Sequence, residues 1–172
     1  LQQADINIKA AKTSLHSTIE EKEKAVNDFQ ELNHKLLNGK KDMDKYNDMA
    51  VKMKNSCLEA NVMTQQREIY SKYQMTCNLA ADVLKKIEAV YDQHAQYELN
   101  MAKAREWMEK AWNTIRANTN TDGKSKEELH GQLDKIRALI RDQEEGQVFV
   151  NGAIDWGEKA VRNTRSDGRD KI

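Results

Sequence analysis

Residues 69–115 read IYSKYQMTCNLAADVLKKIEAVYDQHAQYELNMAKAREWMEKAWNTI, and this stretch decides the fold. Apolar or semi-apolar residues recur in it at alternating steps of four and three, without a missed step. This spacing is the two-position seam of a heptad repeat, and it predicts helices that pack side by side. The seam consists of Ile69, Tyr73, Thr76, Ala80, Val83, Ile87, Val90, His94, Tyr97, Met101, Ala104, Met108, Ala111 and Ile115.

Neither Pro nor Gly interrupts the chain from Asn61 to Asn118, so we expect one continuous helix there. At about 1.5 Å per residue this helix would be about 85 Å long, longer than a compact domain of this chain length is wide. The chain is therefore predicted to be an elongated rod or part of one. Large residues flank the seam, and they widen the apolar stripe enough for each half to pack against two neighbours. These residues are Leu84, Tyr91, Trp107 and Trp112.

Composition excludes several classes of protein. The 28 basic and 28 acidic residues give a net charge of zero, which argues against general binding to a phosphate backbone. A content of 33% charged and 6% aromatic residues with no Pro is typical of long solvated helices rather than of a pocketed enzyme. No apolar run reaches the roughly 18 residues that span a bilayer, and no signal peptide is present. Because Leu1 is not an initiator Met, we expect the chain to be a piece of a larger protein. The two cysteines form no disulfide framework, which favours an intracellular, cytoplasmic location.

The helices on either side of the central one have their own start signals. Residues 1–12 resemble the end of a helix, and Ser17 with Glu20 fits a capping box for the next one. A seam from Ala25 to Cys57 keeps its register across Gly39, so we favour a continuous helix with a weak point there over the alternative, a break at residues 38–40. After a loop over residues 118–123, Ser125 and Glu128 fit a second capping box.

The last helix carries a seam from Leu129 to Val161, and its glycines make its second half the least helix-prone helical stretch. Its seam superposes on that of the helix after Ser17 at a shift of about 104 residues, which places Ala25 on Leu129 and Phe29 on Leu133. A period of this size with three helices per period indicates an internal repeat whose units stack end to end.

This repeat resembles the spectrin-repeat family. The most specific local match is residues 104–110, AREWMEK, which is similar to the first-helix motif of a spectrin repeat. Tyr73 stands where the third helix of that family commonly has a Trp, a departure from the pattern. The resemblance implies an all-α fold of tandem three-helix bundles, each a left-handed coiled coil, that share a long continuous linker helix. Residues 1–93 would form one repeat with a truncated first helix, and residues 94–172 a second repeat without its third helix.

The resemblance also implies a function. Spectrin-like repeats act as load-bearing spacers and scaffolds in cytoskeletal linker proteins. Residues 153–170 look most like the nesprin-type giant proteins, which connect actin to the nuclear envelope, while spectraplakin, dystrophin and spectrin rods stay open. The parent protein would then be linked to actin and the outer nuclear membrane, without membrane insertion or nucleic-acid binding by this segment.

The residues expected to matter are structural. The predicted core of the second repeat comprises Trp107, Met108, Ala111, Ile115, Leu133, Ile136 and Ile140, and the predicted repeat junction comprises Ile87, Val90, His94 and Tyr97. The predicted helix caps are Ser17, Glu20, Ser125 and Glu128.

No pattern of residues predicts catalysis, a cofactor or a metal. The four histidines lack a local nucleophile motif, and the two Glu-x-x-His pairs lie in different repeats, where a surface position explains them better. Two other interpretations of the function of this chain remain open. One is a protein-binding module whose unfilled groove captures a partner helix. The other is a dimerising coiled-coil tether, including exchange of helices between copies of a truncated chain.

Overall fold

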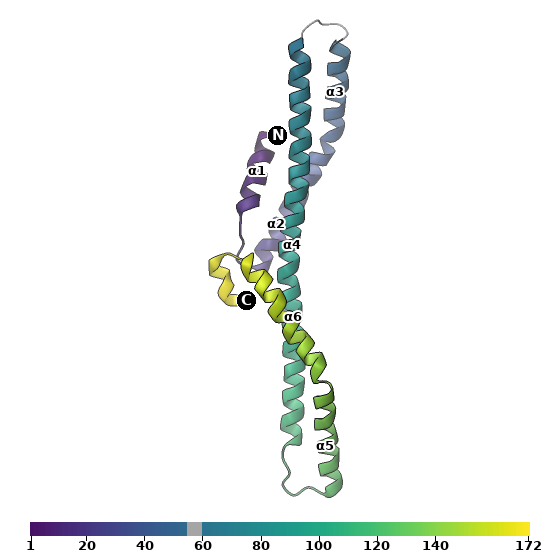
Figure 1. The fold of residues 1–172 in the computed structure, drawn as a ribbon, viewed down its shortest axis with the longest axis vertical. Coiled ribbons are helices and arrows are strands. Elements are labelled where there is room, and N and C mark those ends of the chain that lie inside the picture. The colour runs from purple at the N-terminus through teal and green to yellow at the C-terminus, as the bar shows by residue number, and fades with distance from the viewer. Residues whose placement is uncertain (55–59) are drawn as a thin grey trace. The chain divides into compact units, whose positions relative to one another are not determined.

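The computed structural model describes residues 1–54 and 60–172 of the chain. Within these residues the protein is helical and contains no β-strand, so the predicted all-α class is confirmed. The elements, shown in Figure 1, are α1 (Gln2–Thr13), α2 (Ile19–Asn38), α3 (Lys40–Lys54), α4 (Ala60–Asn118), α5 (Lys126–Arg141), α6 (Gln143–Arg162) and the short 3-10 helix η1 (Ser166–Lys171).

The longest element is α4, an unbroken helix of 59 residues. The predicted long helix over residues 61–118 is therefore confirmed. Half of the predicted seam is fully buried, namely Tyr73, Ala80, Val83, His94, Tyr97, Ala104 and Ala111.

The chain divides into two compact units. The first unit comprises residues 1–91 together with 165–168, and the second comprises residues 92–164 together with 169–172. Whether these units are two spectrin-like repeats, as residues 1–93 and 94–172 were predicted to be, stays a prediction.

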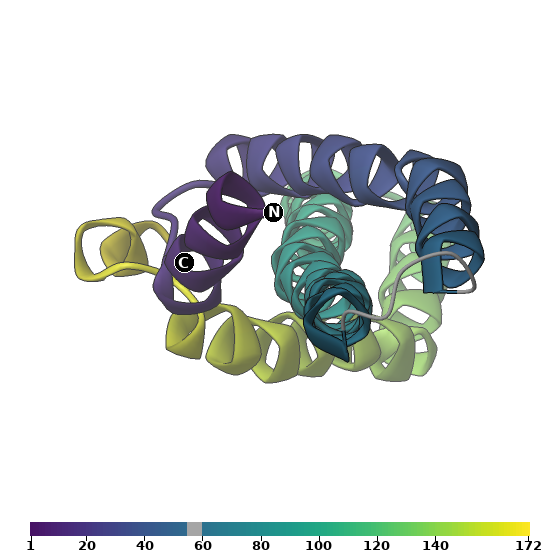
Figure 2. The ribbon, with the colours of Figure 1, turned by 90° about the horizontal axis from the view of Figure 1, so that it is seen from above.

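The core of the first unit lies where α1, α2 and α4 meet. Ile8 of α1, Phe29 of α2, and Ala80 and Val83 of α4 form one buried cluster. Figure 2 shows the purple α1 and the violet α2 on neighbouring sides of the teal α4. An isolated helix as short as the 12-residue α1 is marginal in water, so its burial in this cluster keeps it folded.

The predicted continuous helix across Gly39 is wrong. The structure ends α2 at Asn38 and begins α3 at Lys40, although the Gly39 amide still donates to the Lys35 carbonyl at 3.1 Å. The Tyr73 hydroxyl donates to the Leu36 carbonyl at 2.5 Å, which is the acceptor that a continuous helix would offer to the Lys40 amide. Burial raises the pKa of Tyr73 to about 12, so the hydroxyl keeps its proton for this bond even at moderately alkaline pH.

The predicted helix after Ser125 is also divided. It consists of α5 and α6, which are separated at Asp142. The Glu145 amide donates to the Asp142 carbonyl at 3.2 Å, a three-residue step that tightens the turn relative to an α-helix. At the start of α5, the Glu128 amide donates to the Ser125 hydroxyl at 3.2 Å and the Ser125 amide donates to Glu128 at 2.7 Å. These two bonds form a complete capping box.

The burial of Lys22 in α2 can be tested through the pH dependence of the free energy of unfolding. Its side chain is 1% exposed, and burial lowers the pKa of its ammonium group to about 8 from an ordinary value of 10.5. Between these values the unfolded chain binds more protons, so the stability contributed at this site rises with pH. We expect the free energy of unfolding of the wild type to gain about 1–2 kcal/mol relative to K22M between pH 7 and pH 10. Urea unfolding of both proteins at the two pH values measures this gain. A difference between the proteins that is independent of pH contradicts the prediction.

Candidate functional sites: an open apolar groove and a polar clasp

In the second unit, α6 presents small residues to α4. Gly146, Ala153 and Ala160 recur every seven residues, and all three are buried. Because their side chains are so short, the backbone of α6 can approach α4 closely. The glycines that lowered the predicted helix propensity of this stretch therefore serve packing.

The closest approach is between Gly146 and Trp107. A Cβ atom on Gly146 would lie less than 3.0 Å from three atoms of the Trp107 indole ring, a distance that packed atoms do not reach. A Cβ atom on Gly152 would lie 2.7 Å from Oδ1 of Asn100, and one on Gly157 would lie 3.3 Å from the Tyr97 ring. Thus each of the three glycines of α6 lies against a side chain of α4.

Beside these contacts, along the same helices, an apolar groove is open. Two adjoining hollows of about 730 and 590 Å³ share Met108 and Val150. The residues lining the groove are mostly members of the two heptad seams, namely Tyr97, Met101, Ala104, Met108, Ala111 and Ile115 from α4, with Ile140, Gln147, Val150, Ile154 and Val161 from α5 and α6. The groove therefore exposes seam positions that a further helix would cover in a coiled coil.

Most of the predicted core residues are less buried than expected. Ala111 is buried, while Trp107 and Ile136 are partly buried. The remaining four are exposed by 46% for Met108, 39% for Ile115, 43% for Leu133 and 62% for Ile140. The physical reason is that two helices bury only the positions between them and leave the outer side of each seam uncovered. Trp112, which flanks the seam, is 65% exposed.

The four predicted junction residues lie in different units. Ile87 packs against the core cluster of the first unit, and Val90 is partly buried. His94 and Tyr97 are buried in the second unit, with ring centroids 6.2 Å apart. The Tyr97 hydroxyl donates to the Ile172 carbonyl at 2.5 Å. Cys57, the last member of the seam before α4, lies outside the described residues.

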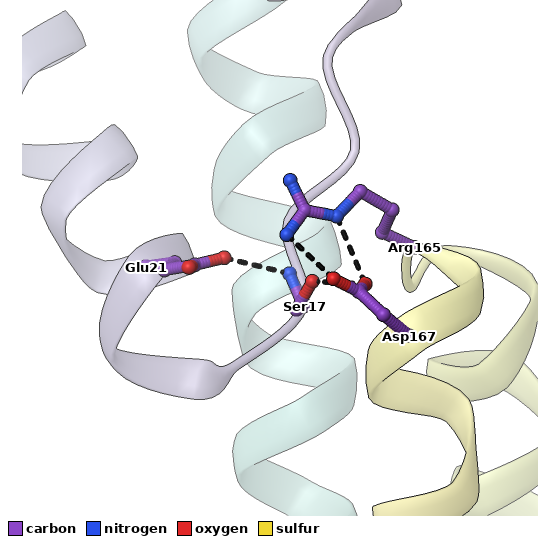
Figure 3. Close-up of polar contacts among 4 residues, drawn as sticks. All are labelled: Ser17, Glu21, Arg165 and Asp167. Carbon is purple, nitrogen blue, oxygen red and sulfur yellow. Dashed lines mark hydrogen bonds and ion pairs between the residues drawn. The ribbon is translucent and has the colours of Figure 1, made fainter.

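A polar cluster in the first unit holds residues 165–168 against residues 16 and 17. We call this cluster the clasp, and Figure 3 shows its side chains. The Ser17 hydroxyl donates to Asp167, and the Arg165 amide donates to the His16 carbonyl at 3.1 Å. The Arg165 guanidinium donates one hydrogen bond to each Asp167 carboxylate oxygen, at 2.9 and 2.7 Å. A Cβ atom on Gly168 would lie well under 3 Å from the Ser17 backbone. No local sequence pattern pairs Ser17 with Asp167, which lie 150 residues apart.

The clasp corrects the predicted capping box at Ser17 and Glu20. The observed N-cap of α2 is Thr18, whose hydroxyl accepts from the Glu21 amide at 3.3 Å. The Ser17 hydroxyl donates to Asp167 instead, and the Ser17 amide donates to the Glu21 carboxylate at 2.8 Å. The N-cap therefore lies one residue later than predicted, and a distant carboxylate accepts from the hydroxyl on which the prediction relied.

The charges of the clasp support each other. Hydrogen bonds from the Arg165 guanidinium and then from the Ser17 hydroxyl hold the pKa of the Asp167 carboxyl well below its usual range. The hydrogen bond from the Ser17 amide lowers the pKa of Glu21. Both carboxyl groups therefore stay ionised at mildly acidic pH, and the clasp is complete wherever they are ionised.

The described residues show no group of three His, Cys, Asp or Glu side chains that could hold a metal ion. Among the helices that the structure describes, none is both long and apolar enough to cross a membrane.

Comparison with known proteins gives one informative match. Over all 172 residues the chain is 46% identical to Muscle-specific protein 300 kDa of Drosophila melanogaster, and it spans about 1% of that protein's length. No family model matches the chain, and no solved structure matches it. The chain is therefore homologous to a short stretch of a far longer protein.

The fit of Gly146 to Trp107 can be tested against Gly131 in α5, where a Cβ atom would meet nothing within 4 Å. We expect G146A to lower the free energy of unfolding by about 1–3 kcal/mol, because the added methyl group displaces the indole ring. We expect G131A to raise it by about 0.5–1 kcal/mol, because Ala favours the helix. Urea unfolding followed by circular dichroism measures both effects. Equal effects of the two substitutions would exclude the close contact.

Proposed function

We propose that this chain is a load-bearing segment of a structural protein, built as two spectrin-like repeats joined by a common helix. The observation that carries the proposal is α4, which runs unbroken through the last residues of the first unit and the first residues of the second. At about 1.5 Å per residue it is about 90 Å long. A continuous helix resists bending where a loop would not, so it suits a spacer that transmits force.

The homologous muscle protein supports this proposal through its name and its length, since repeated helical units are an economical way to build a very long chain. We propose a non-enzymatic role in the cytoskeleton. A link from actin to the nuclear envelope through a nesprin-type parent protein stays a prediction from the resemblance of residues 153–170.

We further propose that a third helix fills the groove of the second unit and completes a three-helix bundle. The groove is lined by two heptad seams, and three predicted core residues on it, Met108, Ile115 and Ile140, are exposed. A helix that buried them would gain about 25 cal/mol for each Å² of apolar surface removed from water. The second unit would then have a closed core like the one that α1, α2 and α4 form in the first.

The same groove favours a second candidate function, a module that binds a helix from another molecule. Its apolar lining, which extends over two adjoining hollows, suits the anchors that a partner helix presents at every third or fourth residue. The two candidates differ in whether the occupant belongs to the same chain or to a different one. In a spacer the groove would be filled by a helix of the same chain, whereas in a dimerising tether it would be filled by a helix of a second copy.

Substitution of Ala95 tests the continuous helix. We expect A95P to shorten the maximum dimension in small-angle scattering and to cost about 3 kcal/mol of stability, because proline removes a backbone hydrogen bond and kinks the helix. A95S keeps the amide and should leave the dimension unchanged. If A95P stays folded with the dimension of the wild type, the continuous helix does not set the length of the molecule.

Oxidation of Met108 tests the groove. We expect a chain extended past residue 172 to remain a monomer and to lose most of the reactivity of Met108 towards hydrogen peroxide. Met75 lies in the first unit, is 68% exposed and should react at the same rate in both proteins. Mass spectrometry of tryptic peptides measures the two rates. Protection of Met108 that depends on protein concentration would favour the tether, and an unprotected Met108 in the extended chain would exclude the three-helix bundle.

A further inference from the structure

The clasp connects four residues of a distant segment to the connection between α1 and α2. Residues 165–168 belong to the first unit, although the chain on both sides of them belongs to the second. Their partners, His16 and Ser17, lie in the short segment between Thr13 of α1 and Ile19 of α2. The clasp therefore acts on the segment that positions α1.

We propose that the clasp is a reversible fastener that controls whether α1 stays packed in the core of the first unit. The packing of α1 depends on few residues, since Ala4 and Ile8 are its only fully buried side chains. A 12-residue helix has little stability of its own, so it remains helical only while it is docked. Fixing the connection at residues 16 and 17 limits the conformations that α1 can reach when it separates from α2 and α4.

The geometry of the clasp depends on the particular side chains at positions 165, 167 and 168. The Arg165 guanidinium binds Asp167 through two parallel hydrogen bonds, which orients the carboxylate towards Ser17. Gly168 is buried and lies so close to the Ser17 backbone that a side chain on it does not fit. The Gly168 amide donates to the Arg165 carbonyl at 2.9 Å and closes the turn. Each of these features serves the docking of residues 165–168 on Ser17.

The clasp is also suited to open before the core does. Arg165 and Asp167 are exposed, and bonds between exposed charges are weakened by salt. The core cluster of Ile8, Phe29, Ala80 and Val83 is apolar and does not depend on ionic strength in this way. Opening the clasp should therefore release α1 by local unfolding, while α2 and α4 remain paired.

Hydrogen exchange of the backbone amides tests the proposal in the whole chain. G168A adds a methyl group against the Ser17 backbone, and S17A removes the hydroxyl that binds Asp167. S166A is the matched control, because Ser166 is exposed in the same 3-10 helix. The Arg165 amide reports directly whether the clasp is open, because it donates to the His16 carbonyl. Amides of α1 report the docking of that helix, and amides near Ala80 report the integrity of the core.

We expect G168A and S17A to speed exchange at Arg165 and throughout α1 by about tenfold or more, with slow exchange retained near Ala80 and no change in S166A. Fast exchange at Arg165 with wild-type protection of α1 overturns the proposal, since the clasp would then be open without effect. Wild-type protection at Arg165 in both variants also overturns it, because the contacts would then not hold the segment. If G168A unfolds the first unit altogether, S17A alone decides between these outcomes.

Discussion

The apolar seam of α4 must be covered along its length, and the neighbouring helices cover it unequally. In the first unit the 12-residue α1 and the longer α2 enclose Ala80 and Val83. In the second unit α6 covers one side of α4 with Gly146, Ala153 and Ala160, and the small size of these residues allows close packing. The other side of the seam there remains the open groove around Met108. The cores and the groove thus have one cause, the presence or absence of a helix beside a given stretch of the seam.

The same seam explains how much of the fold could be predicted. A heptad pattern is repeated many times over α4, so single exceptions such as His94 do not obscure it, and the long helix follows. The breaks at Gly39 and Asp142 lie instead beside contacts between helices, which the heptad pattern does not encode. Tyr73 takes the carbonyl of Leu36, and Gly146 must lie against Trp107. Propensity identifies glycine only as a weak helix former, and it does not indicate which glycine is needed for contact.

The two predicted caps illustrate the same limit, because both have a Ser followed three residues later by a Glu. Ser125 and Glu128 form both bonds of a capping box, as the local pattern predicts. Ser17 stands before a similar pattern, but Asp167 binds its hydroxyl from 150 residues away and the cap moves to Thr18. A local pattern shows which bonds a residue can make with its neighbours. It carries no information on a competitor that the fold brings from elsewhere, so the clasp could not be predicted from it.

Two physical kinds of contact stabilise this molecule, and they respond to different conditions. The apolar clusters depend on water being excluded, so they weaken with denaturant and change little with salt. The clasp depends on ionised groups, because Arg165 and Ser17 stabilise the charged form of Asp167. The contribution of the clasp to stability is complete above the ordinary pKa of the Asp167 carboxyl. It is lost as the pH falls from that value towards the lowered pKa of the folded state. This combination suits the proposed load-bearing role, since a clasp that opened reversibly would yield while the apolar seam kept the long helix in place.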